Sequence, residues 1–255
     1  MIQGRSFLIL VSIALSLPFS FEAYAGFEFN PIIATFTPTG PGSTVSFQAV
    51  NPDDIKVPVQ ISVVAREPNL LGEEVYKETD EVDEQFKIFP SQFILNAKET
   101  RTVRVTWVGA PKVPSELAFR ILAEEVPVDL EDPNKRLKKP VARFNITSKY
   151  VGSLYVVTSG AAPKLTIEAK PTEKSNPPRM TVILKNTGTL HQVLKAPTIK
   201  FEPATGGPAV EPSPDGIKAI AGQNILANKT RQFDIQWPKG LPVGPVKVSL
   251  DLPKD

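Results

Sequence analysis

Residue types that could carry out catalysis are scarce in this chain of 255 residues, which has one histidine and no cysteine. The histidine, His191, follows a turn-like Thr-Gly-Thr-Leu stretch, and the sequence has no nucleophile elbow and no phosphate-binding glycine loop. A catalytic triad needs a histidine base beside its nucleophile, and zinc sites typically take several His or Cys ligands. We therefore expect no catalytic residue, no metal site and no cofactor, and we do not expect an enzyme.

Neighbouring carboxylates are a second possible source of acid–base chemistry. The pairs are Asp53 with Asp54, Glu73 with Glu74, and Glu124 with Glu125. Adjacent residues on a strand point to opposite faces, so the members of such a pair cannot readily share one substrate. Solvated faces and local ion pairs are the favoured interpretation.

The most informative spacing lies in residues 142–150, Ala-Arg-Phe-Asn-Ile-Thr-Ser-Lys-Tyr. Ala142, Phe144 and Ile146 alternate with polar residues in steps of two, as on a strand with one apolar face, and Lys149 lies on the polar side. From the pattern alone, two interpretations stay open. The strand buries Phe144 and Ile146 in its own core, or it presents them to a partner.

Similar alternation recurs along the chain and indicates the elements around this segment. The first half has such runs at residues 45–49, 57–64, 103–107 and 119–123, and shorter runs follow after residue 164. Turn-forming residues separate the runs, and 26 prolines, about double the usual share, disfavour long helices. The sequence therefore predicts an all-β protein made of sandwiches.

The N-terminus has the features of a secretory signal peptide in their usual order: Arg5, an apolar run at residues 7–17, then Ala23-Tyr24-Ala25. The run is about half the ~20 residues of a membrane-spanning helix, so we expect export of a soluble chain without membrane insertion. Cleavage after Ala25 leaves 255 − 25 = 230 residues. We predict a signal peptide at 1–25, an N-terminal domain at 26–157, a linker at 158–163 and a C-terminal domain at 164–255.

The small net charge of the chain argues against nucleic-acid binding. The formal net charge is +2, and nucleic-acid binders carry a clear excess of Lys and Arg on one face. We therefore expect no nucleic-acid partner. Residues 129–140 run from acidic to basic without alternation and are interpreted as a long exposed loop.

Three blocks of sequence, in this order, resemble the periplasmic chaperones of chaperone-usher pilus assembly over essentially the whole mature chain. They are residues 89–107 with Phe-Pro and Thr-Val-Arg-Val, residues 117–127 ending in Glu-Glu-Val-Pro, and the loop and strand that follow up to Tyr150. Residues 27–33 fit the family's first strand more loosely. The resemblance implies two immunoglobulin-like β-sandwich domains, location in the periplasm, and pilin subunits and an outer-membrane usher as partners.

The resemblance also implies roles for particular residues. In this family the last strand of the first domain completes the pilin by donor-strand complementation. Ala142, Phe144 and Ile146 match the inserted residues, and Lys149 matches one half of a basic pair that holds the subunit's C-terminal carboxylate. The other half, an arginine on the first strand, is replaced by Ile33. A divergent branch of the family is one explanation, and an anchor from elsewhere, such as Arg104 or Arg120, is another.

A structural or adhesive pilus component built from similar extracellular sandwiches is the alternative function. A pilin should be a single domain with an alternating apolar N-terminal extension. Here Gly26 to Pro31 leads directly into a predicted strand, and a second domain follows. The sequence therefore favours a chaperone over a pilin.

Overall fold

The computed structural model describes residues 26–128, 147–173 and 175–253 of the chain. The first half contains β1 (Glu28–Asn30), β2 (Ile33–Phe36), β3 (Thr44–Val50), β4 (Val57–Ala65), β5 (Phe86–Phe89), β6 (Gln92–Leu95), β7 (Thr100–Trp107), β8 (Leu117–Glu125) and β9 (Lys149–Val156). The second half contains β10 (Leu165–Pro171), β11 (Arg179–Asn186), β12 (Gln192–Val193), β13 (Thr198–Pro203), β14 (Asn224–Ile225), β15 (Thr230–Gln236) and β16 (Val246–Asp251). The helices are short: η1 (Pro41–Ser43), α1 (Asp80–Asp83) and η3 (Pro214–Ile217).

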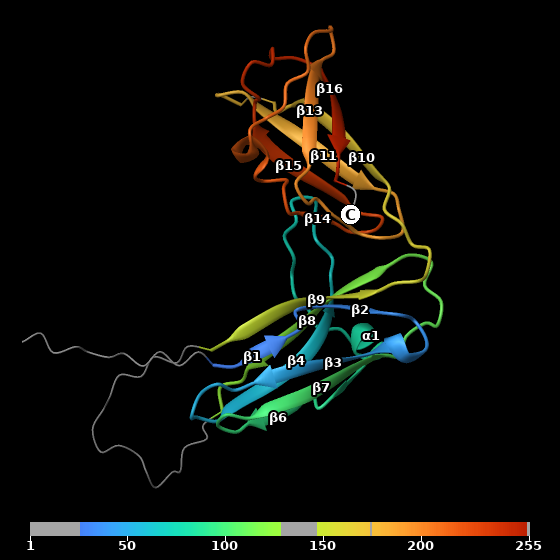
Figure 1. Ribbon diagram of the computed structural model, residues 1–255, viewed down its shortest axis with the longest axis vertical. Helices are drawn as coiled ribbons and strands as arrows, with labels where there is room; N and C mark the ends of the chain where they lie inside the picture. The colour runs from blue at the N-terminus through green and yellow to red at the C-terminus, as the bar shows by residue number, and fades with distance from the viewer. Residues whose placement is uncertain (1–25, 129–146, 174, 254–255) are drawn as a thin grey trace, which may run out of the picture.

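Strands β1 to β9 form the first sandwich, the lower body in Figure 1. One sheet has the order β1-β3-β7-β5, and the other has the order β2-β9-β8-β4-β6. Neighbouring strands are antiparallel except β2 and β9, which run parallel. In this order β9 lies between β2 and β8, and β2 pairs with its last four residues, Ser153–Val156.

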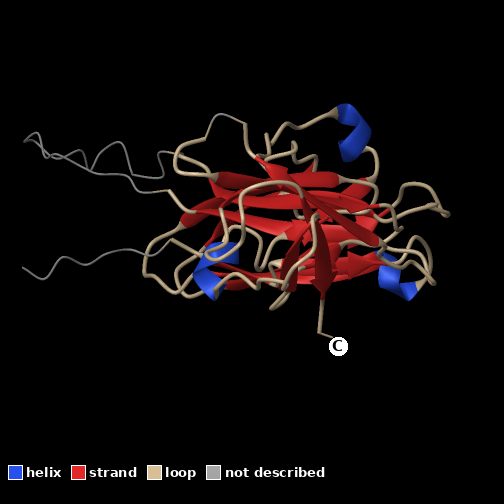
Figure 2. Cartoon of the chain, turned by 90° about the horizontal axis from the view of Figure 1, so that it is seen from above, coloured by secondary structure: helices blue, strands red, loops and turns tan. Residues whose placement is uncertain are grey.

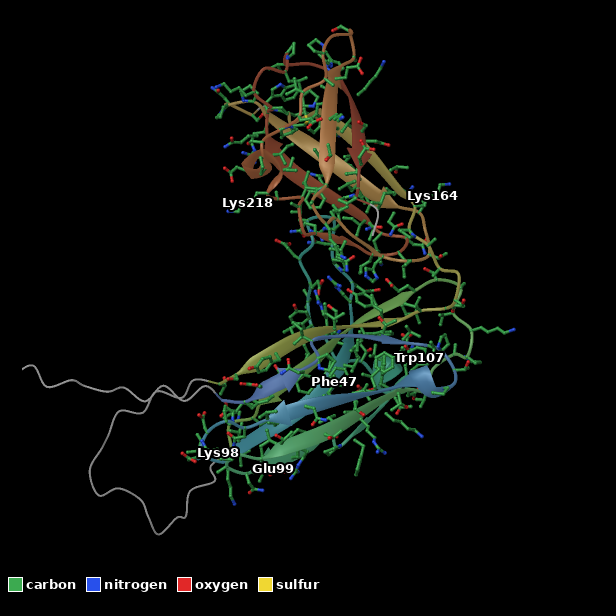
Figure 3. The ribbon with its side chains drawn as sticks, viewed as in Figure 1. Phe47, Lys98, Glu99, Trp107, Lys164 and Lys218 are labelled. Atoms are coloured by element: carbon green, nitrogen blue, oxygen red, sulfur yellow. The ribbon has the colours of Figure 1, made fainter. Side chains whose placement is uncertain are left out.

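Period-two patterning explains the core of this sandwich. On β7 the side chains of Val103, Val105 and Trp107 are buried, and the residues between them are exposed or half-buried. Phe47 and Trp107 lie within the first sandwich in Figure 3, whereas Lys98 and Glu99 mark the turn between β6 and β7 at the end far from the upper body. The predicted run at 103–107 is therefore a strand with its apolar face inward.

Strands β10 to β16 form the second sandwich, in which β10-β11-β15 and β13-β16 enclose a separate core and β12 pairs with β14. Met180, Leu184 and Phe201 are fully buried in that core. Figure 2 shows the strands stacked in layers with the short helices at the periphery. Within the described residues, no helix is long and apolar enough to cross a membrane.

One loop of the first sandwich reaches the second. Residues 66–79, here called the strap, join β4 to α1 and rise as a teal hairpin toward the upper body (Figure 1). The backbone N–H of Gln232 donates to the carbonyl of Leu70 over 2.7 Å, and Arg231 donates to the carbonyl of Leu71 over 3.2 Å. The tip of the strap is thus bonded to β15.

The lone histidine lies at the same junction. His191 Nδ1 is 2.6 Å from Glu116 Oε2, and the His191 ring stacks on Tyr155 with centroids 4.2 Å apart. The backbone N–H of Glu116 donates to the carbonyl of Thr189, and Asn224 donates to the Tyr155 hydroxyl over 2.9 Å. His191 therefore joins the two sandwiches through side-chain contacts.

Candidate functional site

Basic side chains gather on the outer face of the sheet that contains β9. Ile33 pairs with Ser153, and Ser153 pairs with Arg120, so these three residues form one row across β2, β9 and β8. Cross-strand partners share a face of the sheet. Arg120 donates to Ser153 Oγ over 2.6 Å. A guanidinium thus lies in the row of Ile33, the position at which the resemblance noted in the sequence leads us to expect an arginine.

Lys149 lies on the same face at the start of β9. It pairs with Glu124 of β8, its Nζ is 2.5 Å from Glu124 Oε1, and its Nζ is 5.6 Å from the ring centroid of Tyr76. The Lys149 side chain is 45% exposed. Because Lys149 and Ser153 are four residues apart, both point outward, about 13 Å from each other at ~3.3 Å per residue. The outer face therefore presents two basic groups, Lys149 of β9 and Arg120 of β8, in rows about four residues apart.

Glu74 of the strap is bound between two arginines on this face. Its carboxylate accepts from Arg120 Nε at 2.6 Å and NH2 at 2.9 Å, and from Arg66 Nε at 2.9 Å. Burial acts to raise the pKa of the Glu74 carboxyl, but the hydrogen bonds and charges of Arg120 and Arg66 hold the pKa below its usual range. Glu74 therefore stays ionised to a lower pH than an ordinary glutamate.

Arg231 of β15, in the second sandwich, places a third guanidinium near Arg66 and Glu74. Burial lowers the pKa of Arg231, the charge of Arg66 lowers it further, and the charge of Glu74 opposes both. Arg231 Nε is buried without a hydrogen-bond partner among the described residues. We call Arg66, Arg120 and Arg231 the arginine cluster. Throughout the described part of the chain, Glu74 is the only carboxylate paired with Arg66 or Arg120, and no carboxylate pairs with Arg231.

The neighbouring carboxylates of the strap differ in environment. Glu73 is exposed and accepts from the side chain of Asn69, whereas Glu74 turns into the arginine cluster. The sequence favours local ion pairs for such carboxylates, but Arg120, a partner of Glu74, lies 46 residues away in sequence. No local pattern in the sequence marks Glu74 as its partner.

The predicted donor residues Ala142, Phe144 and Ile146 lie outside the described residues. The chain enters the described part again at residue 147, and the carbonyl of Ser148 accepts from the backbone N–H of Glu125. Among the alternative anchors, Arg120 lies on the outer face of the β9 sheet, whereas Arg104 is exposed on β7 of the other sheet. The structure thus brings Lys149 and Arg120 to one face and leaves Arg104 on another sheet.

Neither a protein family nor a curated protein matches the sequence. Solved structures do match its fold. The class 5 fimbriae chaperone CfaA aligns with 90% of this chain and 100% of its own, at 17% identity and a TM-score of 0.55. The chaperone CsuC in its complex with the tip subunit CsuE, from archaic Csu pili of Acinetobacter baumannii, aligns with 89% of this chain and 98% of its own, at 16% identity and a TM-score of 0.58.

The chain has the fold of the chaperone-usher pilus chaperones. A third match, from a chaperone–tip adhesin complex of CFA/I fimbriae, covers 90% of this chain at 18% identity and a TM-score of 0.56. The prediction of an all-β protein with two immunoglobulin-like sandwiches is therefore confirmed. The domain boundaries at residues 157 and 163 stay predictions. In this chaperone fold, β9 and the outer face around it form the candidate site.

Proposed function

We propose that the protein is a periplasmic chaperone that captures pilin subunits by donor-strand complementation and delivers them to an outer-membrane usher. The observation that carries the proposal is the fold match along nearly the whole chain to fimbrial chaperones, two of them solved with a tip subunit. The predicted signal peptide supports a periplasmic location. Binding rather than catalysis is the role that this fold supports.

Strand addition gives the mechanism. A subunit with an incomplete sheet has unpaired backbone N–H and C=O groups, which an added strand from the chaperone can satisfy. The residues directly before β9 are the donor in this proposal, with Phe144 and Ile146, and Ala142 beside them, filling apolar pockets of the subunit. β8 pairs with β9 along its whole length from Lys149, and β2 pairs with its last four residues, so the donor segment leads into a strand that β8 holds from its first residue. That support favours an extended donor segment.

Lys149 is proposed to bind the C-terminal carboxylate of the subunit and so to fix the register of the donor strand. Register matters because a slip of one residue would turn Phe144 and Ile146 away from the groove. Arg120 is the proposed second basic group, because its guanidinium lies in the row where Ile33 replaces the family arginine. An incoming carboxylate competes with Glu124 for Lys149.

Replacement of Lys149 by alanine is expected to weaken subunit capture about ten- to a hundredfold. A charge-assisted hydrogen bond shielded from water contributes about 1.5 to 3 kcal/mol, which corresponds to that loss. Lys149→Met should behave alike, because it keeps the aliphatic stem without the charge. The dissociation constant of the chaperone–subunit complex, measured by titration calorimetry, tests this, with Lys87→Ala on the other sheet as a control.

The proposed partner of Lys149 is tested by removing the negative charge of the subunit's C-terminal carboxylate. A subunit with an amidated C-terminus should bind the wild type about as weakly as the intact subunit binds Lys149→Ala, and the two changes together should cost little more than either. Fully additive losses would contradict the anchor assignment.

A further inference from the structure

The strap covers the basic groups of the candidate site with its own side chains. Glu74 contacts Arg66 and Arg120, and two residues later the ring of Tyr76 lies 5.6 Å from Lys149 Nζ. Leu122, which points to the same face between these groups, is buried although it lies outside the core of the first sandwich. The strap thus runs along the outer face of β8 and β9, from the row of Arg120 toward that of Lys149.

Few bonds hold the part of the strap that follows Glu74. Residues 75–78 make no backbone hydrogen bond to another described residue. Val75 is 85% exposed, and Tyr76 is also exposed. Little apolar area therefore keeps this segment in place. The ion pairs of Glu74 with Arg66 and Arg120 are its main attachment to the sheet.

We infer that the strap is an autoinhibitory element in which Glu74 occupies a carboxylate-binding site made by Arg66 and Arg120. A carboxylate carried by a binding partner exchanges with Glu74, and the strap moves off the outer face of β8 and β9. The site accepts this ligand class because guanidinium groups bind carboxylates in two-point geometry, as Arg120 already binds Glu74.

The charge balance of the cluster favours such an exchange. Glu74 is ion-paired with Arg66 and Arg120, and its charge also acts on Arg231, whose Nε is buried without a partner among the described residues. Arg231 also holds the tip of the strap through the carbonyl of Leu71. The excess positive charge attracts a second anion, and the arginines themselves stay in place: Arg120 is bonded to Ser153 and Arg66 to the Tyr155 hydroxyl at 2.7 Å.

Acetate is the simplest probe of the exchange, because it presents the carboxylate alone. Glu74→Gln removes the internal charge with little change in shape. It should therefore bind acetate about tenfold more tightly than the wild type, since no charge-assisted bonds to Glu74 have to be broken first. Binding is read from the side-chain Nε–Hε NMR signals of Arg66 and Arg120 in the isotope-labelled protein during titration with sodium acetate.

Glu73→Gln is the matched control, because Glu73 is the adjacent, exposed carboxylate and contacts Asn69 rather than the arginines. It should bind acetate like the wild type. Equal acetate affinity of Glu74→Gln and the wild type overturns the inference. So does acetate binding that leaves the Arg66 and Arg120 signals unchanged.

A second variant disturbs the contact between the tip of the strap and Arg231 and leaves Arg66 and Arg120 unaltered. A Cβ at Gly72 would lie 2.0 Å from Arg231 NH2 and 2.2 Å from its Cζ, so in Gly72→Ala either the tip of the strap or the end of the Arg231 side chain must shift, and we expect the tip to shift. Faster amide exchange at Gln232, which donates to Leu70, and severalfold tighter acetate binding are expected. Gly240→Ala is the control, because Gly240 has φ +88° against +87° at Gly72 but open space around its Cβ position. Tip release without any gain in acetate affinity contradicts autoinhibition by the strap.

Two peptides distinguish between a C-terminal and a side-chain carboxylate as the group that the site binds. N-acetyl-Ala-Ala-Ala with a free C-terminus carries only an α-carboxylate, and N-acetyl-Ala-Glu-Ala-amide carries only a side-chain carboxylate. The identification of the partner as a pilin rests on the proposed function, whereas acetate exchange does not. Gain of acetate affinity in Glu74→Gln together with failure to capture any subunit would reject the proposed function and leave the autoinhibitory strap standing.

Discussion

The variant with Phe144→Ser and Ile146→Ser is expected to lose subunit capture completely. Burial of each apolar side chain in the groove of the subunit contributes about 1.5 to 3 kcal/mol, so loss of both removes about 3 to 6 kcal/mol of binding free energy. That corresponds to a loss of affinity of more than a hundredfold. Asn145→Ser and Thr147→Ser together are the matched control. They alter the polar positions that alternate with Phe144 and Ile146 in the same segment, and they should retain capture.

The same variant distinguishes a donor strand from an ordinary core strand. If Phe144 and Ile146 insert into a partner, the free chaperone should keep its melting temperature. If they fill the core of the first sandwich, each replacement should destabilise the protein by several kcal/mol. Thermal unfolding followed by circular dichroism measures this, and a large fall in melting temperature would contradict the donor role.

Phe86→Ala is expected to destabilise the first sandwich by about 3 to 5 kcal/mol. Phe86 is buried, and its ring centroid lies 5.8 Å from Phe36, 5.2 Å from Trp107 and 5.0 Å from Phe119, so truncation leaves a cavity among aromatic rings. Phe89 ends the same strand with 78% of its surface exposed. Phe89→Ala should change the unfolding free energy by less than about 0.5 kcal/mol.

Urea unfolding is monitored by Trp107 fluorescence in proteins that also carry Trp237→Phe, so that the signal comes from the first sandwich alone. Phe86 and Phe89 are the same residue type on one strand, so the two variants are directly comparable. Equal destabilisation by Phe86→Ala and Phe89→Ala would show that the aromatic cluster does not carry the stability assigned to it.

The strands of the first sandwich could be predicted because their patterning is local. Apolar residues at 103, 105 and 107 and at 119, 121 and 123 alternate with other residues, and they form the buried faces of β7 and β8. β4 was predicted from residues 57–64, but its alternation fails at Val64, which is buried on the outer face. The burial of Val64 cannot be predicted from period-two patterning, because it depends on which residues cover the outer face of the sheet.

The candidate site was only partly predictable for the same reason. Lys149 could be placed on the polar side of its strand from spacing, and its role as an anchor stays a prediction. Glu74 could not be found, because its partners Arg66 and Arg120 reach it only after the strap has folded across the sheet. Contacts between residues far apart in sequence leave no local signal in one sequence. The sequence offers Arg120 and Arg104 as alternative anchors, and the sheet arrangement places them on different sheets.

Purification of the tagged protein from the periplasm of cells that express a pilin subunit of the same genome tests the central claim most directly. Native mass spectrometry should show a one-to-one complex of the protein, starting at Gly26, with the subunit. The complex should be absent with the Phe144→Ser and Ile146→Ser variant. Recovery of the protein alone while the folded subunit accumulates, or its incorporation into the assembled fibre, would contradict a chaperone and favour a structural or adhesive component.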